Sequence, residues 1–404
     1  MSSKSAIRNL QLITALDSLS YGLIYAFISP YILKLGGNHV HVGILAVGVI
    51  LGELLSPEVT KLFSHLNGKR YALFLILNTS LVTHLLLVLT DSYWFTILVR
   101  ILFSLTNQSQ KLCLELLLNR AQNDDEKGKI RSNYSILSGL GFILGPIISG
   151  HLFDIGFGYI GVLVALLASI NSGLLMNVAN DNKDKNPEHT DKSVLQKAIG
   201  NVSERLQDLQ KSNYNKHWDM LFMKYLFSSS VMIFFSKFSQ ILKHNYAASS
   251  MRIGYTASYI NILVFSATYL TTVIKSKTQE YPEVFLSEIA FFFETIFLLF
   301  ACYAPYYEMF VILLIPIIVI RSFLTDLWKE LFSERKDNNL IKLNQSASIV
   351  AGLTTPVLFG FTCNVFAKEA VVLFSCVPIL LCWIITRFYS KDLKIEETTS
   401  DKDK

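Results

Sequence analysis

The chain has 404 residues, of which 51% are hydrophobic and 17% charged, with a mean hydropathy of +0.41 and a formal net charge of +5. Soluble domains usually carry about 25% charged residues, so this composition excludes an ordinary soluble globular fold. Apolar runs of about 20 residues, long enough to cross a bilayer core of roughly 30 Å, recur along the whole chain. The sequence therefore predicts an all-α, multi-pass integral membrane protein.

Twelve apolar runs follow one another along the chain, six on each side of a long polar segment. The expected spans are residues 8–33, 42–63, 70–91, 93–118, 133–157, 158–180, 218–242, 250–275, 284–303, 307–330, 343–365 and 370–390. This pattern predicts an N-terminal six-helix bundle at 1–180 and a C-terminal six-helix bundle at 218–390. The charged tail at 391–404 is expected to be disordered.

The polar segment at 181–217 contains a repeating apolar pattern. Leu195, Ile199, Val202, Leu206 and Leu209 recur at steps of three and four, which is the spacing of one helical face. The pattern favours an amphipathic helix on the cytoplasmic membrane surface. The alternative is a solvated linker that joins the two halves.

The distribution of Lys and Arg predicts the orientation of the chain, because these residues stay on the cytoplasmic side during insertion. With both termini in the cytoplasm, the external loops hold Lys34, Lys243, Arg252 and Lys368, and most of the other basic residues fall in cytoplasmic segments. The positive net charge is then a topology signal and does not indicate nucleic-acid binding. We expect residence in the plasma membrane or an endomembrane.

Known chemical motifs are not found. The five cysteines lie inside expected spans without a CxxC pair, and the sequence has no HExxH, nucleotide-binding loop or Ser-His-Asp pattern. We therefore expect neither a metal site nor a cofactor, and no enzymatic activity.

Charged residues inside spans are the strongest candidates for function, because each costs several kcal/mol unless it is paired or faces water. Asp17 lies in the middle of the first span, one helical turn before Tyr21, and Arg100 lies in the outer half of the fourth. A buried carboxyl group that a nearby arginine alternately pairs and releases is a workable proton carrier. The alternative is a buried structural ion pair.

Other charges fall on the fourth, seventh and tenth spans, and these are further candidates for proton coupling or a substrate cavity. They are Lys111, Glu115, Lys237, Arg321 and Asp326. Glu53 and Glu58 flank Pro57 in the second span, and Glu294 lies in the ninth. For these three glutamates the sequence leaves open a cavity position or an interhelical contact.

The two halves resemble each other in sequence. Arg100-Ile-Leu-Phe-Ser-Leu in the fourth span has a counterpart in Arg321-Ser-Phe-Leu-Thr-Asp in the tenth. Pro146 and Gly150 match Pro356 and Gly360, and the fifth span's Gly141 matches Gly352 in the eleventh. Internal duplication is common in transporters of this size.

Two motifs resemble those of a known family. The fifth span reads Gly139-Leu-Gly141-Phe-Ile-Leu-Gly145-Pro146-Ile-Ile-Ser-Gly150, which is similar to the glycine-proline motif of major facilitator antiporters. Small residues four apart let two helices pack closely, and a proline loosens the helix. Between the second and third spans, Gly68, Lys69 and Arg70 fit the gating loop of that superfamily, although Ser64 stands where an acidic residue is usual.

The resemblance to the major facilitator superfamily implies two pseudo-symmetric six-helix bundles in which spans 1, 4, 7 and 10 line a central cavity. It implies secondary active transport of a small organic solute by alternating access, with protons as a second partner and the bilayer as surroundings. The branch that the chain most resembles is that of tetracycline-resistance and drug:proton antiporters, with their eukaryotic major facilitator domain-containing relatives. We expect the protein to be a monomer. The alternative to transport is that the chain serves as a membrane scaffold or sensor.

Overall fold

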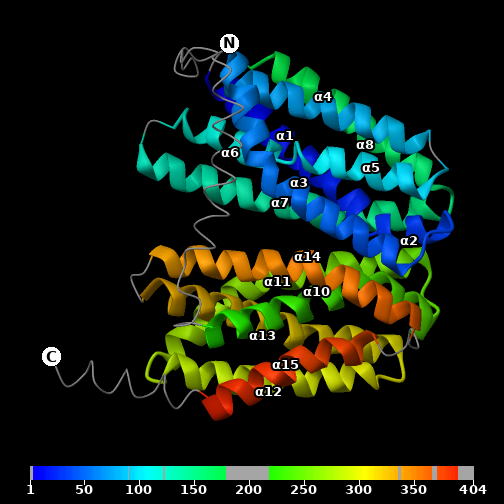
Figure 1. The fold of residues 1–404 in the computed structure, drawn as a ribbon. Coiled ribbons are helices and arrows are strands. Elements are labelled where there is room, and N and C mark those ends of the chain that lie inside the picture. The colour runs from blue at the N-terminus through cyan, green and yellow to red at the C-terminus, as the bar shows by residue number, and fades with distance from the viewer. Residues whose placement is uncertain are drawn as a thin grey trace. The chain divides into compact units, whose positions relative to one another are not determined.

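The computed structural model describes residues 3–89, 91–121, 123–178, 218–334, 338–365 and 371–389, and within these ranges it contains fourteen α-helices and no strand (Figure 1). The predicted amphipathic helix at 181–217 and the tail at 391–404 lie outside the described residues. The chain forms two compact units. Unit 1 is Met1–Leu206 with Ser249–Asn261, and unit 2 is Gln207–Ala248 with Ile262–Lys404.

The helices of each unit follow the predicted spans in chain order. Unit 1 contains α1 (Ser3–Tyr25), α2 (Ile28–Lys34), α3 (His39–Asn67), α4 (Lys69–Val88), α5 (Tyr93–Ser104), α6 (Ser109–Leu118), α7 (Asp124–Phe153) and α8 (Phe157–Met176). Unit 2 contains α10 (Trp218–Tyr246), α12 (Glu283–Cys302), α13 (Tyr307–Glu334), α14 (Asn338–Val365) and α15 (Val371–Tyr389). Helix α11 (Ser250–Thr278) begins in unit 1 and continues in unit 2.

Two predicted spans are interrupted, which the sequence reading did not anticipate. The first span divides into α1 and α2 at Ala26 and Phe27, and the fourth divides into α5 and α6 at residues 105–108. Near the second break, the hydroxyls of Ser104 and Thr106 donate to backbone carbonyls three residues earlier. Such local bonds compete with the regular helical ladder.

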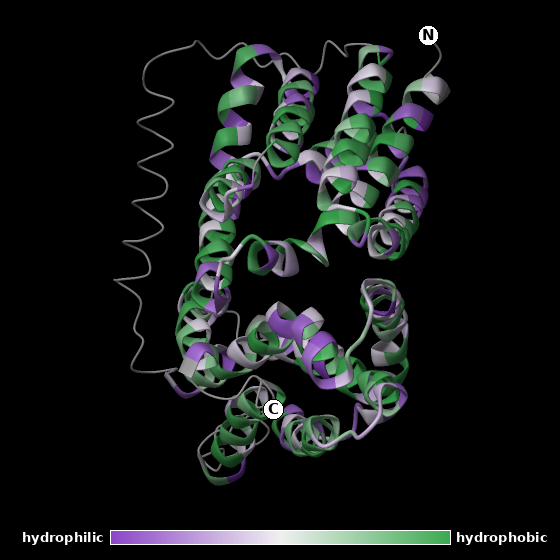
Figure 2. Cartoon of the chain, turned by 90° about the vertical axis from the view of Figure 1, so that its right-hand side faces the viewer, coloured by the Kyte–Doolittle hydropathy of each residue, from purple (hydrophilic) through white to green (hydrophobic). Residues whose placement is uncertain are grey.

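Most helices are long and apolar enough to cross a bilayer. Ten candidate membrane spans are found among the described residues, and a shorter apolar helix covers Val372–Phe388. Large apolar side chains are exposed along these helices, for example Leu166, Phe265 and Leu358. Figure 2 shows hydrophobic residues running along much of each long helix. A surface of this kind is stable against lipid tails and costly in water, so the chain is a multi-pass membrane protein.

The packing of unit 1 is repeated in unit 2. Helix α1 packs on α7 and α8 as α10 packs on α14 and α15, and α4 packs on α8 as α12 packs on α15. A serine pair joins equivalent helices in both units. The Ser18 hydroxyl donates to Ser138 at 3.1 Å, and the Ser228 and Ser348 hydroxyls lie 3.2 Å apart; in each pair the partners are 120 positions apart in the sequence. The duplication in sequence is therefore a duplication of structure.

The crossing of α1 and α7 depends on glycines of the GxxxGP motif. A Cβ atom added at Gly145 would lie 2.5 Å from the carbonyl carbon of Gly22, and one added at Gly141 would lie 2.6 Å from the backbone nitrogen of Leu19. Real Cβ atoms do not approach backbone so closely, so the two helices are in contact backbone to backbone.

Replacing Gly145 with Ala should destabilise the protein, because α1 and α7 would have to separate. We expect a loss of about 1–3 kcal/mol, the usual cost of overpacking. The measurement is the thermal stability of the purified protein in detergent. Gly173→Ala is the matched control, since an added Cβ there meets no atom within 4 Å. Equal effects of the two variants would contradict the close crossing.

Candidate functional site

Asp17 lies in unit 1 where the fourth span is interrupted. Its side chain is buried, with the residue 7% exposed, and its Oδ2 accepts a hydrogen bond of 2.7 Å from the hydroxyl of Ser109. Ser109 is the first residue of α6, directly after the break. The interruption therefore brings a hydroxyl donor from the fourth span to the carboxyl group of α1.

Three amide side chains at the break bind neighbouring helices. The Asn107 amide donates to Glu53 Oε1 at 3.2 Å, and the Gln108 amide donates to Ser56 Oγ at 2.7 Å, so both reach α3. The Gln110 amide donates to Ser18 Oγ at 3.2 Å, on α1. Together with the Asp17 contact, these bonds form a polar network that connects α1 and α3 with the break and the start of α6.

Arg100 lies on α5 beside this network. It is 7% exposed, and its guanidinium carbon lies 5.0 Å from the centre of the Phe103 ring. Its electrostatic neighbours are Tyr21 and Glu53. Within the described residues, Arg100 Nε is buried without a hydrogen-bond partner, and Arg100 forms no ion pair with Asp17. The guanidinium therefore keeps hydrogen-bonding capacity for a further group.

Tyr21 connects the two candidate charges. Its ring centre lies 5.6 Å from that of Phe103, and the Asn107 side chain is a polar neighbour of its hydroxyl. Arg100, Glu53 and Asp17 are its charged neighbours. The structure thus brings Asp17, Tyr21 and Arg100 into one region of unit 1.

In unit 2, Arg321 forms a buried ion pair. Its Nε lies 2.6 Å from Glu294 Oε1, and the two residues are 5% and 0% exposed. The guanidinium also donates to Ser230 Oγ at 3.2 Å and lies over the ring of Phe234. Of the two positions that the sequence left open for Glu294, the structure shows the interhelical contact, between α12 and α13.

The remaining charges expected on the seventh and tenth spans, Lys237 and Asp326, have other neighbours. Lys237 is 1% exposed on α10, with Cys363 of α14 as an electrostatic neighbour. Asp326 accepts a hydrogen bond from Thr271 of α11 and pairs with Lys329 at 2.9 Å. Both residues therefore take part in contacts inside unit 2.

The expected gating loop makes contacts within unit 1. Gly68 has a φ of +86°, which permits the tight turn between α3 and α4. Lys69 pairs with Glu115 of α6 at 2.9 Å, and the Arg70 guanidinium donates to the carbonyls of Leu175 and Met176 at the end of α8. Lys69 and Arg70 thus tie the start of α4 to two other helices.

The glycines and prolines expected in helix packing are placed at helix contacts. Gly150 of α7 lies against Ser250 and Gly254 at the start of α11, within unit 1. In unit 2, Gly352, Pro356 and Gly360 are buried along α14, the helix that packs on α10.

The sequence analysis missed the polar partners at the break, above all Ser109, Asn107 and Gln108. A signal was present, because Thr106-Asn-Gln-Ser-Gln110 is an uninterrupted polar run inside an otherwise apolar span. Polar groups in a span indicate a contact with protein or a watery cavity.

The chain belongs to the Major Facilitator Superfamily, a family of membrane transporters, whose family model matches residues 10–335. It is 20% identical over 396 residues to an uncharacterised MFS-type transporter, YxaM, of Bacillus subtilis (strain 168), covering 95% of this chain and 96% of that protein.

Solved structures share the fold. The nucleoside transporter NupG matches with a TM-score of 0.74 and 13% identity, covering 96% of this chain and 99% of that one. A bacterial homologue of the human lysosomal transporter Spinster matches with a TM-score of 0.74 and 11% identity, covering 96% and 98%.

Glu294→Gln should destabilise unit 2 strongly, because it leaves the buried charge of Arg321 without a carboxylate. Breaking a buried pair in this way costs about 3–5 kcal/mol. Thermal unfolding in detergent provides the measurement. On the same helix, Glu288→Gln is the control, since its partner Arg387 has a side chain that is 60% exposed. The double change Glu294→Leu with Arg321→Met should recover most of the loss, and failure to recover would contradict a purely structural pair.

Proposed function

We propose that this chain is a secondary active transporter that exchanges a small organic solute for protons by alternating access, with Asp17 as the proton carrier. The observation that supports it is the buried carboxyl group of Asp17, which accepts a hydrogen bond from Ser109 at the interruption of the fourth span. A hydroxyl donor stabilises the ionised carboxylate, whereas the buried surroundings favour the protonated acid. A small movement of α6 can therefore change the proton affinity of this group.

Arg100 supplies the second part of the proposed mechanism. Its buried guanidinium has a free donor at Nε and lies beside Tyr21 and Glu53. An arginine in this state attracts an anionic group, such as Asp17 after it has released its proton. Exchange requires the proton and the solute to compete for one group, so the solute would bind the ionised Asp17 beside Arg100 and be displaced when the carboxyl group takes up a proton.

The packing of α7 supports assignment to the antiporter branch of the superfamily. The sequence resembles those antiporters in the GxxxGP segment from Gly141 to Pro146. This segment packs closely against α1, and α1 is the helix that carries Asp17. Motion at this crossing would act on the helix of the proposed proton carrier. We also propose that both termini lie in the cytoplasm, as the distribution of Lys and Arg indicates.

A scaffold or sensor that does not transport is the second candidate. Ser64 supports it, because the hydroxyl at this usually acidic position donates to the backbone carbonyl of Thr60 on its own helix, and within the described residues it makes no hydrogen bond with a charged side chain. Against it stands the cost of keeping Asp17 and Arg100 buried without a mutual ion pair.

The proposal predicts that Asp17→Asn abolishes proton coupling while the protein still folds and inserts. The protein is reconstituted in liposomes with a pH indicator inside, and organic cations, anions and neutral solutes are added one at a time. We expect a solute to evoke a pH change with the native chain and with the control Asp125→Asn, which removes an exposed acid at the start of α7. A pH change that survives in Asp17→Asn would exclude Asp17 as the carrier, and silence across the library would favour the scaffold.

Replacing Arg100 distinguishes charge from geometry. If the positive charge binds the anionic group, Arg100→Ala should lower the initial rate of solute uptake by about tenfold or more, and Arg100→Lys should retain a larger share. The rates are measured in the same liposomes at matched protein content. Equal losses in the two variants would mean that the planar guanidinium is required, and unchanged rates would remove Arg100 from the mechanism.

A further inference from the structure

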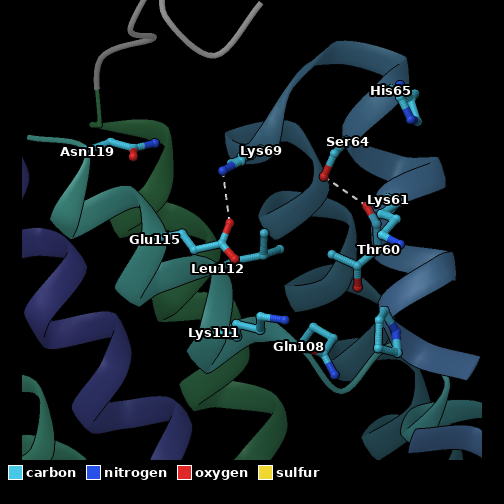
Figure 3. A pocket seen from close by; sticks show the side chains of 11 residues that line it. Thr60, Lys61, Ser64, His65, Lys69, Gln108, Lys111, Leu112, Glu115 and Asn119 are labelled. Carbon is cyan, nitrogen blue, oxygen red and sulfur yellow. Dashed lines mark hydrogen bonds and ion pairs between the residues drawn. The ribbon is translucent and has the colours of Figure 1, made fainter. Parts of the chain in front are cut away.

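A cavity of about 470 Å³ lies in unit 1 between the end of α3, the start of α4 and α6 (Figure 3). Its lining residues are Pro57, Thr60, Lys61, Ser64, His65, Lys69, Gln108, Lys111, Leu112, Glu115 and Asn119. Most of them are polar, and all come from one unit. The cavity is large enough for a phosphate group together with part of the molecule that carries it.

The charges around the cavity are unbalanced. Three lysines line it, and one glutamate opposes them. Lys69 is neutralised by Glu115 at 2.9 Å, and Lys61 by Glu58 at 2.8 Å, although Glu58 is not itself a lining residue. Lys111 forms no ion pair within the described part of the chain, and it is exposed to the cavity. One surplus positive charge therefore remains.

The unpartnered lysine extends into the space between two helices. Figure 3 shows Lys111 extending from α6 toward α3, on the side where Thr60 and Gln108 lie. An ammonium group is a compact charge with three donors, and it binds phosphate as a point charge.

A second polar group of the cavity also lacks a partner. Thr60 Oγ1 is buried, and it makes no hydrogen bond within the described residues. A buried hydroxyl without a partner costs about 1–3 kcal/mol, so it indicates a group that is bound when the site is occupied. Asn119, at the end of α6, brings a further amide to the same cavity.

From these contacts we infer that the cavity between α3, α4 and α6 is a binding site for a phosphate-type anion, held by Lys111 with Thr60 as a hydroxyl donor. The anion can be a free phosphate or the headgroup of an anionic lipid, because both present the same oxygen atoms to the lysine. Bound there, it would neutralise Lys111 and connect α3 with α6 next to the Lys69–Glu115 pair. The site is distinct from Asp17 and Arg100, so it goes beyond the proposed transport function.

The test measures equilibrium binding to the full chain and needs no transport. Inorganic phosphate is titrated by calorimetry into protein in neutral detergent at constant ionic strength. In a second arm, native mass spectrometry counts the phosphatidylglycerol molecules retained by protein extracted from nanodiscs. Each arm compares the native chain with Lys111→Gln, Glu115→Gln and the control Lys129→Gln, an exposed lysine on α7.

We expect Lys111→Gln to weaken binding by about tenfold or more, because a hydrogen-bonded charge pair is lost. Glu115→Gln should tighten binding several-fold, because it removes the opposing charge and releases Lys69. Lys129→Gln should have no effect. This pattern with phosphate in detergent identifies a free phosphate as the ligand, and the same pattern with phosphatidylglycerol alone identifies a headgroup.

Binding in neither arm would overturn the inference, and so would binding that Lys129→Gln weakens as much as Lys111→Gln. If Lys111→Gln does not fold, Lys111→Arg should preserve binding of the anion. The higher affinity expected for Glu115→Gln then tests the site. No tightening in Glu115→Gln would then reject the site.

Discussion

Hydrocarbon offers no hydrogen bonds, and this single constraint organises the molecule. Every polar group within a span needs a hydrogen-bond partner inside the protein, or one that a bound solute, ion or water supplies. The backbone meets this condition by forming helices, and the interrupted fourth span meets it through the side chains that surround the break. The few charges that remain in the interior are therefore informative, because each carries a cost that some contact must offset.

The two units meet this constraint differently at their buried arginines. Each arginine lies on the fourth span of its unit and stacks on an aromatic ring, Phe103 for Arg100 and Phe234 for Arg321. Arg321 is paired with a buried carboxylate, Glu294, whereas Arg100 forms no ion pair within the described residues. Each guanidinium also has one buried nitrogen without a hydrogen-bond partner there, Nε in Arg100 and Nη1 in Arg321. A paired charge suits a structural role and an unpaired one suits a bound anion. Duplication thus gave the chain two similar positions, of which the N-terminal one supports the proposed exchange.

Much of the fold could be predicted from the sequence, because hydropathy and the distribution of glycine and proline act locally. Each of the twelve spans follows from the hydropathy of its own segment. The correspondence of Pro146 and Pro356 follows from aligning the two halves of the sequence. The break in the fourth span and the partners of Asp17 and Arg321 could not be predicted in the same way. Those contacts depend on how distant helices pack, and a single charged residue in a span does not reveal which helix will supply its partner.

The most direct test of the account is whether Asp17 exchanges a proton inside the folded protein. Infrared difference spectra of the reconstituted chain, recorded while the pH is changed, detect the carbonyl stretch of a protonated carboxyl group. If Asp17 carries the proton, a carboxyl band appears as the pH falls, is missing in Asp17→Asn and is retained in Asp125→Asn. A spectrum of Asp17→Asn identical to that of the native chain would mean that Asp17 does not titrate, and it would contradict the proposed proton carrier.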